Sequence, residues 1–173
     1  MSALMTVSEL ARSVGAREVL GDARVTFASV STDTRTLAPG ALFVALRGER
    51  FDGHAYADAA VERGAVALMV EHPLESTVPQ IVVADSRHAL GVGAAQWRAR
   101  FTLPVIAITG SNGKTTVTQM VGAILAQAYG ERHRLATRGN LNNEIGAPLM
   151  LWQLNRQHKA AVFELGMNHP GEI

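Results

Sequence analysis

The chain has 173 residues, room for one ordinary domain or two small ones, and its 47% hydrophobic and 18% charged content excludes a disordered chain. With 16 Lys and Arg against 15 Asp and Glu, the net charge of +1 gives no general argument for binding nucleic acid or an anionic membrane. The absence of cysteine excludes a disulfide scaffold, a cysteine nucleophile and a thiolate metal site. No secretory signal or bilayer-spanning run is predicted, so we expect a soluble cytoplasmic protein.

The first hundred residues predict a small unit in which strands alternate with helices. A capping box, Thr6-Val7-Ser8-Glu9, predicts the first helix start. Strands are expected at 25–31, 41–46, 66–70 and 80–83. Helices are expected at 54–63 and from Asp85 or Ser86 to about 101. This alternation indicates an α/β fold with a largely parallel sheet.

The pattern restarts after a boundary that we expect near residues 101–104, which gives domains at 1–102 and 103–173. Strands are predicted at 105–109, 134–137 and 160–165, and helices at 115–128 and 148–154. The second unit is short for a parallel-sheet nucleotide domain and stops just after a strand. We therefore expect a small N-terminal α/β substrate domain followed by the truncated start of a P-loop ATPase domain. Its incomplete sheet would have a free edge open to self-association.

The strongest chemical signal is the run Thr109-Gly110-Ser111-Asn112-Gly113-Lys114-Thr115-Thr116, between an apolar strand and a predicted helix. A phosphate-binding loop requires this context. Its glycines let backbone N–H groups turn toward an anion, the lysine is suited to the β- and γ-phosphates, and the hydroxyl of Thr115 to Mg²⁺. Ile108 stands where the usual pattern has its first glycine. We predict binding of a nucleoside triphosphate with Mg²⁺; the alternative is a turn that only joins strand to helix.

This loop resembles the ATP loop of the Mur ligases and of the related folylpolyglutamate synthases. Segments 137–148 and 161–173 resemble the MurF type within that family, and segments 31–35, 40–48 and 51–54 resemble the N-terminal domain that MurE-type and MurF-type ligases share. The resemblance implies an ATP-dependent amide-bond ligase of peptidoglycan precursor synthesis. ATP would phosphorylate the terminal carboxylate of UDP-N-acetylmuramoyl-tripeptide, and the amine of D-alanyl-D-alanine would attack the acyl phosphate.

The family has three domains, and the resemblance places this chain in the first domain and the opening of the second. We therefore expect the chain alone to be an inactive fragment and the full enzyme to be a monomer. By the same resemblance, Lys114 and Glu164 are catalytic, with Thr115 and Glu164 as the Mg²⁺ ligands. The expected UDP-substrate residues carry hydroxyl, amide, acidic or basic groups: Ser31, Thr32, Asp33, Thr34, Arg35, Arg47, His54, Asn140, Asn142 and Asn143.

Each assignment has a plainer alternative. Glu164 is otherwise a solvated acid at a strand end, Asp33 and Arg35 a surface ion pair, and the asparagines ordinary loop residues. Two competing functions stay open: a MurE-type or folylpolyglutamate-type ligase, and a non-catalytic module that binds a UDP-sugar-peptide and does not need Lys114.

Overall fold

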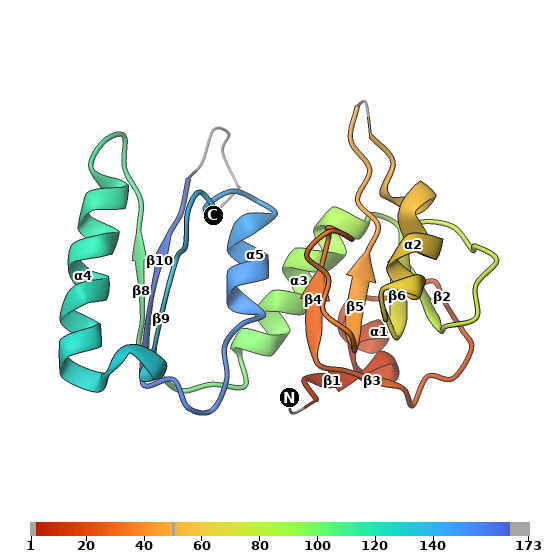
Figure 1. Ribbon diagram of the computed structural model, residues 1–173, viewed down its shortest axis with the longest axis horizontal. Coiled ribbons are helices and arrows are strands. Elements are labelled where there is room, and N and C mark those ends of the chain that lie inside the picture. The colour runs from red at the N-terminus through yellow and green to blue at the C-terminus, as the bar shows by residue number, and fades with distance from the viewer. Residues whose placement is uncertain (1–2, 50, 167–173) are drawn as a thin grey trace. The chain divides into compact units, whose positions relative to one another are not determined.

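The computed structural model of the protein describes residues 3–49 and 51–166 (Figure 1). It divides into two compact units, Met1–Gly93 and Ala94–Ile173, and both have the expected α/β character. The division falls inside helix α3 (Ser86–Arg98), upstream of the boundary expected near residue 102. The reason is that Trp97, near the end of α3, donates its ring N–H to the carbonyl of Leu154 at 3.0 Å and stacks on Trp152.

The first unit contains a five-stranded sheet with the order β2-β7-β6-β5-β4. Its strands are β2 (Glu18–Leu20), β4 (Ser29–Ser31), β5 (Ala41–Val44), β6 (Ala67–Val70) and β7 (Gln80–Val82). The pairings from β4 to β7 are parallel, as predicted, whereas β2 pairs antiparallel with β7. Sequence analysis missed β2, because this edge strand is short and only partly buried.

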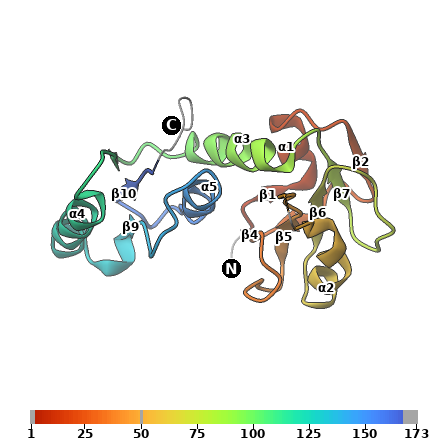
Figure 2. The same ribbon diagram turned by 90° about the horizontal axis from the view of Figure 1, so that it is seen from above.

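The core of the first unit forms on both faces of this sheet. Every residue of β5, β6 and β7 is buried, which explains their unbroken apolar sequences. On one face, Phe43 and Leu68 pack with Ala57 and Ala60 of helix α2 (Ala57–Glu62). Helix α1 (Val7–Ser13) lies on the opposite face (Figure 2). A 3₁₀ turn, η1 (Gly53–Tyr56), leads into α2, so the predicted helix at 54–63 consists of two short segments.

The strand predicted at 25–31 is wrong as one element. It consists of β3 (Thr26–Phe27), which pairs antiparallel with β1 (Met5–Thr6), and of β4, which joins the five-stranded sheet. The change of partner occurs at Ala28, whose N–H donates to the carbonyl of Gly40 at 2.8 Å. The alternation of apolar and polar residues changes phase between Phe27 and Ala28, at the point where the chain changes sheet, and the prediction of a single strand did not take this change into account.

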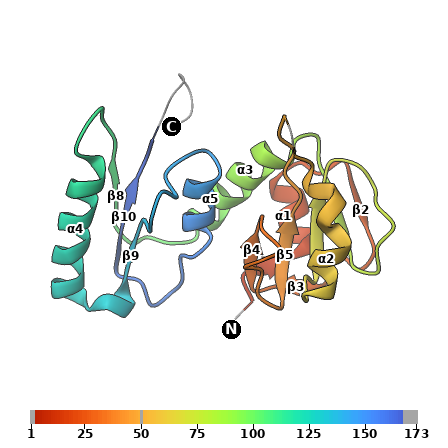
Figure 3. The same ribbon diagram turned by 45° about the horizontal axis from the view of Figure 1, so that its top comes forward.

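The second unit has a three-stranded parallel sheet with the order β8-β10-β9. The strands are β8 (Val105–Ile108), β9 (Arg134–Ala136) and β10 (Ala160–Glu164). Helix α4 (Lys114–Tyr129) covers one face and α5 (Gly146–Leu151) lies on the other, and a 3₁₀ turn, η2 (Glu131–His133), follows α4 (Figures 1 and 3). The helix predicted at 148–154 thus begins earlier and ends earlier.

An apolar surface lies along α4 and β8. Val117, Met120 and Ile124 of α4 are 45%, 62% and 64% exposed, and Ile106 of β8 is 39% exposed. Among the described strands, β8 lies at an edge of its sheet. A free edge was expected from the sequence, and self-association through it stays a prediction. None of the described helices has both the length and the apolar character needed to cross a bilayer.

The capping box of α1 gives a first test of local stability. Glu9 N–H donates to the Thr6 hydroxyl at 3.1 Å, and the Thr6 N–H donates to the Glu9 carboxylate at 2.7 Å. Thr6→Ala removes the first bond, and we expect it to lower the free energy of unfolding by about 1 kcal/mol in urea denaturation. Ser13→Ala, at the other end of α1, is the control and should change it by less than about 0.5 kcal/mol. Equal effects would contradict the capping role.

Candidate functional site

The loop between β8 and α4 has the backbone that a phosphate site needs. Gly110 and Gly113 have φ angles of 136° and 75°, in the region that favours glycine. No heavy atom lies within 4 Å of a Cβ built at either position, so it is the conformation and not lack of space that requires glycine. Ile108 remains in β8, and its carbonyl accepts from Leu165 N–H at 2.8 Å, so the turn starts after it. This explains why the loop does not use a glycine at 108.

The start of α4 presents donors to solvent. Its first helical bond runs from Val117 N–H to the Gly113 carbonyl at 2.9 Å, so the N–H groups of residues 114–116 precede it without helical acceptors. The ammonium of Lys114 donates to the Gly110 carbonyl at 2.6 Å and lies across the loop. Thr115 and Thr116 are exposed. A positive helix end, N–H groups without helical acceptors and a lysine are the groups that a phosphate site requires.

Glu164 is the buried acid of this edge. It ends β10 opposite Ile108, the last residue of β8, and is 4% exposed. Its Oε1 accepts from the side-chain amide of Asn142 at 2.6 Å, and its N–H donates to the Thr137 hydroxyl at 2.9 Å. Within residues 3–49 and 51–166 no basic group pairs with its carboxylate. A buried acid without a basic partner is suited to a cation.

The donor set fits Mg²⁺ bound together with a nucleotide. The carboxylate of Glu164 lies at the carboxyl end of β10, which pairs in parallel with β8. The exposed hydroxyl of Thr115 belongs to the segment that follows the carboxyl end of β8. The described part of the chain has no group of three or more His, Cys, Asp or Glu residues that could hold a metal. Mg²⁺ usually keeps several waters and takes one or two carboxylates plus phosphate oxygens, so a single acid is sufficient.

The three asparagines expected at the substrate differ in their surroundings. The side-chain oxygen of Asn143 accepts from Gly146 N–H at 2.8 Å and Ile145 N–H at 3.2 Å, which starts α5. Asn142 holds Glu164, as described above, while Asn140 is exposed. The part of the MurF-like segment 161–173 beyond residue 166 lies outside the described residues.

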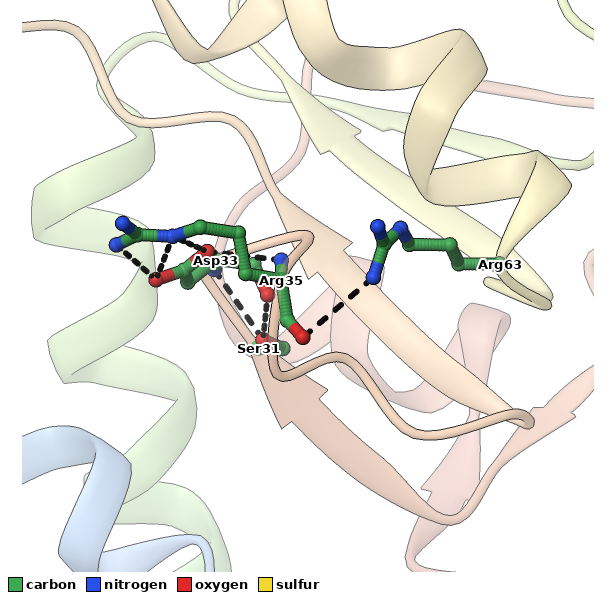
Figure 4. A network of polar contacts seen from close by, with 4 residues as sticks. All are labelled: Ser31, Asp33, Arg35 and Arg63. Atoms are coloured by element: carbon green, nitrogen blue, oxygen red, sulfur yellow. Dashed lines mark hydrogen bonds and ion pairs between the residues drawn. The ribbon is translucent and has the colours of Figure 1, made fainter.

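In the first unit, Ser31 ends β4 and the residues up to Arg35 form the turn that follows it (Figure 4). The Ser31 hydroxyl donates to the Asp33 carbonyl at 3.0 Å, and the Arg35 guanidinium donates to the Asp33 carboxylate at 2.6 Å. Side-chain and backbone hydrogen bonds from Arg35 lower the pKa of Asp33 to about 2. Arg63 donates to the Arg35 carbonyl at 3.5 Å. The Arg35 side chain is nevertheless 85% exposed, so the turn holds the guanidinium at the surface.

His54 and Arg47, the other basic residues expected at the UDP substrate, follow β5. His54 is buried, and its Nδ1 lies 2.6 Å from Asp52 Oδ1 while its Nε2 accepts from Glu71 N–H at 2.9 Å. Since Nε2 accepts, Nδ1 carries the proton, and both ring nitrogens are bonded within the chain. Asp52 also caps η1 by accepting from His54 N–H, which lowers the pKa of Asp52. Arg47 is exposed, and a nucleotide contact of His54 stays a prediction.

Sequence analysis did not identify two features: the hydrogen bond between Thr137 and Glu164, and a cleft beside Thr137. The Thr137 hydroxyl fixes the backbone of Glu164, a contact between distant segments for which a single sequence has no signal. The cleft, of about 320 Å³, lies between α4 and β9. Its lining is mostly polar: Thr118, Gln119, Ala123, Glu131, Arg134, Ala136, Thr137 and Arg138. Thr137 thus lines this cleft and also accepts a hydrogen bond from the backbone of Glu164.

A glycine-rich loop after one parallel strand, with a buried acid at the end of the neighbouring strand β10, is the arrangement typical of P-loop proteins. Two family models match the chain: the Mur ligase family, catalytic domain, over residues 26–98, and the Mur ligase middle domain over residues 108–172. The chain belongs to the Mur ligase family.

Similar proteins carry the MurF name. The UDP-N-acetylmuramoyl-tripeptide–D-alanyl-D-alanine ligase of Escherichia coli (strain K12) is 51% identical over 89% of this chain and 33% of its own length. A crystal structure of MurF from Acinetobacter baumannii has a TM-score of 0.87 at 40% identity, over 97% of this chain and 37% of that one. MurF ligase from Thermotoga maritima, solved in complex with ADP, has a TM-score of 0.70 at 30% identity, over 83% of this chain and 33% of that one. The chain thus spans about a third of these relatives.

The contact between Asp33 and Arg35 can be tested through the pKa of Asp33. Arg35→Ala should raise the pKa of Asp33 from about 2 toward the usual value of about 3.9, as measured by NMR of the carboxyl carbon. Because the folded-state pKa is the lower one, the pair stabilises the protein above about pH 4, and this stabilisation is lost as the pH falls toward 2. Because the guanidinium is exposed and solvent screens the pair, this contribution to stability should be small.

The Asp22–Arg24 pair is the matched control, because Arg24 likewise lowers the pKa of Asp22. Arg35→Ala should leave the pKa of Asp22 unchanged. An Asp33 titration that does not move would contradict the hydrogen bonding seen in Figure 4.

Proposed function

We propose that this chain forms the UDP-substrate unit and the opening of the ATP unit of a MurF-type ligase. Such an enzyme joins D-alanyl-D-alanine to UDP-N-acetylmuramoyl-tripeptide at the expense of ATP, in peptidoglycan precursor synthesis. The observation that carries the proposal is the parallel register of β8 and β10, which aligns the P-loop strand with Glu164. The MurF names of the relatives support the substrate assignment. A cytoplasmic location is part of the proposal, since the reaction consumes ATP.

The chemistry requires that two anions come together. The substrate carboxylate would attack the γ-phosphate of ATP and release ADP. The incoming amine would then attack the carbonyl carbon of the acyl phosphate, forming the amide bond and releasing phosphate and a proton. Lys114 would bind the β- and γ-phosphate oxygens through the N–H donors that are not bonded to the Gly110 carbonyl, and the N–H groups of the loop would hold the phosphate chain. Thr115 and Glu164 would hold Mg²⁺, which when bound neutralises the charge that keeps the reactants apart. Most of the rate enhancement would then come from alignment and charge stabilisation.

The UDP moiety would bind the first unit at the carboxyl ends of β4 and β5. These strands are adjacent and parallel, so the segments that follow them start from the same edge. Arg35 and Arg47 are exposed and could bind the diphosphate, with hydroxyls from Ser31, Thr32 and Thr34. Asn140 of the second unit is exposed, and its contact with a substrate stays a prediction.

The ATP site is tested by Lys114→Ala. We expect it to weaken Mg·ATP binding to this chain at least about tenfold in calorimetric titration, because a charge-assisted bond to phosphate is lost. Lys159→Ala removes the same charge from an exposed position before β10 and should leave the affinity unchanged. Equal affinities for both variants and the unmodified chain would exclude the P-loop as the ATP site.

The UDP site is tested by titration with UDP-N-acetylmuramoyl-tripeptide. Arg35→Ala should weaken binding about tenfold, the value of one charge-assisted bond, whereas Arg24→Ala, in the similar Asp22–Arg24 pair, should have no effect. Mg·ATP binding without binding of the UDP compound would favour a folylpolyglutamate-type ligase. UDP-compound binding that survives Lys114→Ala, in a chain without ATP binding, would favour the non-catalytic module.

A further inference from the structure

The segment that follows β9 is tied to the end of β10 by three hydrogen bonds. The Asn142 amide donates to Glu164 Oε1 at 2.6 Å, and the Asn142 carbonyl accepts from Gly166 N–H at 2.7 Å. Glu164 N–H donates to the Thr137 hydroxyl at 2.9 Å. Asn142 therefore contacts Glu164 through its side chain and, through its backbone, Gly166, two residues after the end of β10.

The side-chain bond decides where the carboxylate of Glu164 points. A glutamate side chain has three torsions, so the carboxylate of a buried glutamate needs a hydrogen-bond partner to keep a single orientation. In the described part of the chain, Asn142 is the one group that donates to this carboxylate, and it does so at Oε1. Oε2 is thereby left for another ligand.

An amide is an appropriate partner for an acid that must bind a cation. The NH₂ group of asparagine donates without carrying a charge, so it fixes the carboxylate and leaves its full negative charge to the metal. A lysine or arginine in the same place would neutralise that charge and would repel Mg²⁺.

We propose that Asn142 is a positioning residue for Glu164, which it holds in the orientation that binds the metal of Mg·ATP, and that it is not a contact to the UDP substrate. This inference rests on the metal role proposed for Glu164 above. Groups that orient a metal ligand in this way typically change metal affinity or activity by about 10- to 100-fold when they are removed.

The test measures binding and does not need a complete ligase. The unmodified chain, Asn142→Leu and Asn142→Ala are titrated by calorimetry with ATP in the presence and absence of Mg²⁺, and Mn²⁺ binding in the presence of ATP is followed by electron paramagnetic resonance. Both variants keep the backbone bond to Gly166. We expect each to lose about 10- to 100-fold in Mg·ATP affinity while binding metal-free ATP as the unmodified chain does.

Asn155→Ala is the matched control. Its side-chain oxygen accepts from Gln157 N–H at 2.9 Å and does not contact Glu164, so the variant should not change the Mg²⁺ dependence. A double-mutant cycle adds a readout that a merely structural role would not give. In the Glu164→Gln background, Asn142→Leu should cause no further loss of Mg·ATP affinity, because the two residues act through one ligand.

The outcomes separate this inference from the proposed function. If Glu164→Gln weakens Mg·ATP binding but Asn142→Leu does not, or weakens ATP binding equally without Mg²⁺, the positioning role is overturned and the metal site stands. Additive losses in the double variant would likewise overturn it. If Glu164→Gln has no effect, or the unmodified chain shows no Mg²⁺-dependent binding, the metal role of Glu164 is wrong and the positioning role is wrong with it.

Discussion

The parallel pairing of β8 with β10 is the constraint on which the candidate site depends. It aligns Glu164 with Ile108, so that the acid and the start of the phosphate loop leave the sheet at the same edge. Neither part is sufficient alone: the loop supplies donors for an anion, and the acid supplies a ligand for the cation that accompanies it. A shift of one residue in this register would turn the side chain of Glu164 to the other face of the sheet.

The strands of the two units differ in how far they are buried. In the first, β5, β6 and β7 are buried throughout, and the alanines of α2 allow that helix to pack closely on Phe43 and Leu68. In the second, only the central strand β10 is fully buried, while the equally apolar β8 is partly exposed. The sequence of β8 is that of a strand covered on both faces, yet the described residues cover it incompletely.

Much of this could be predicted from the sequence because the signals are local. The capping box at Thr6, the glycines of the phosphate loop and the cap at Asp52 each depend on residues a few positions apart. Partner choice could not be predicted in the same way. The division of the strand at Ala28 and the bonds from Asn142 and Thr137 to Glu164 join segments that only the fold brings together. Asn140, Asn142 and Asn143 could not be distinguished in the sequence, although their side chains make different contacts in the structure.

The contact between Lys114 and the Gly110 carbonyl has a consequence for the energetics of the loop. The ammonium is hydrogen-bonded to this carbonyl at 2.6 Å, and a lysine ammonium has three N–H donors. Two donors are therefore left for phosphate oxygens, and phosphate binding at this lysine does not require the bond to Gly110 to break. The carbonyl of Gly110 thus acts as a tether: it restricts the side-chain torsions of Lys114, so less conformational entropy is lost when a phosphate binds.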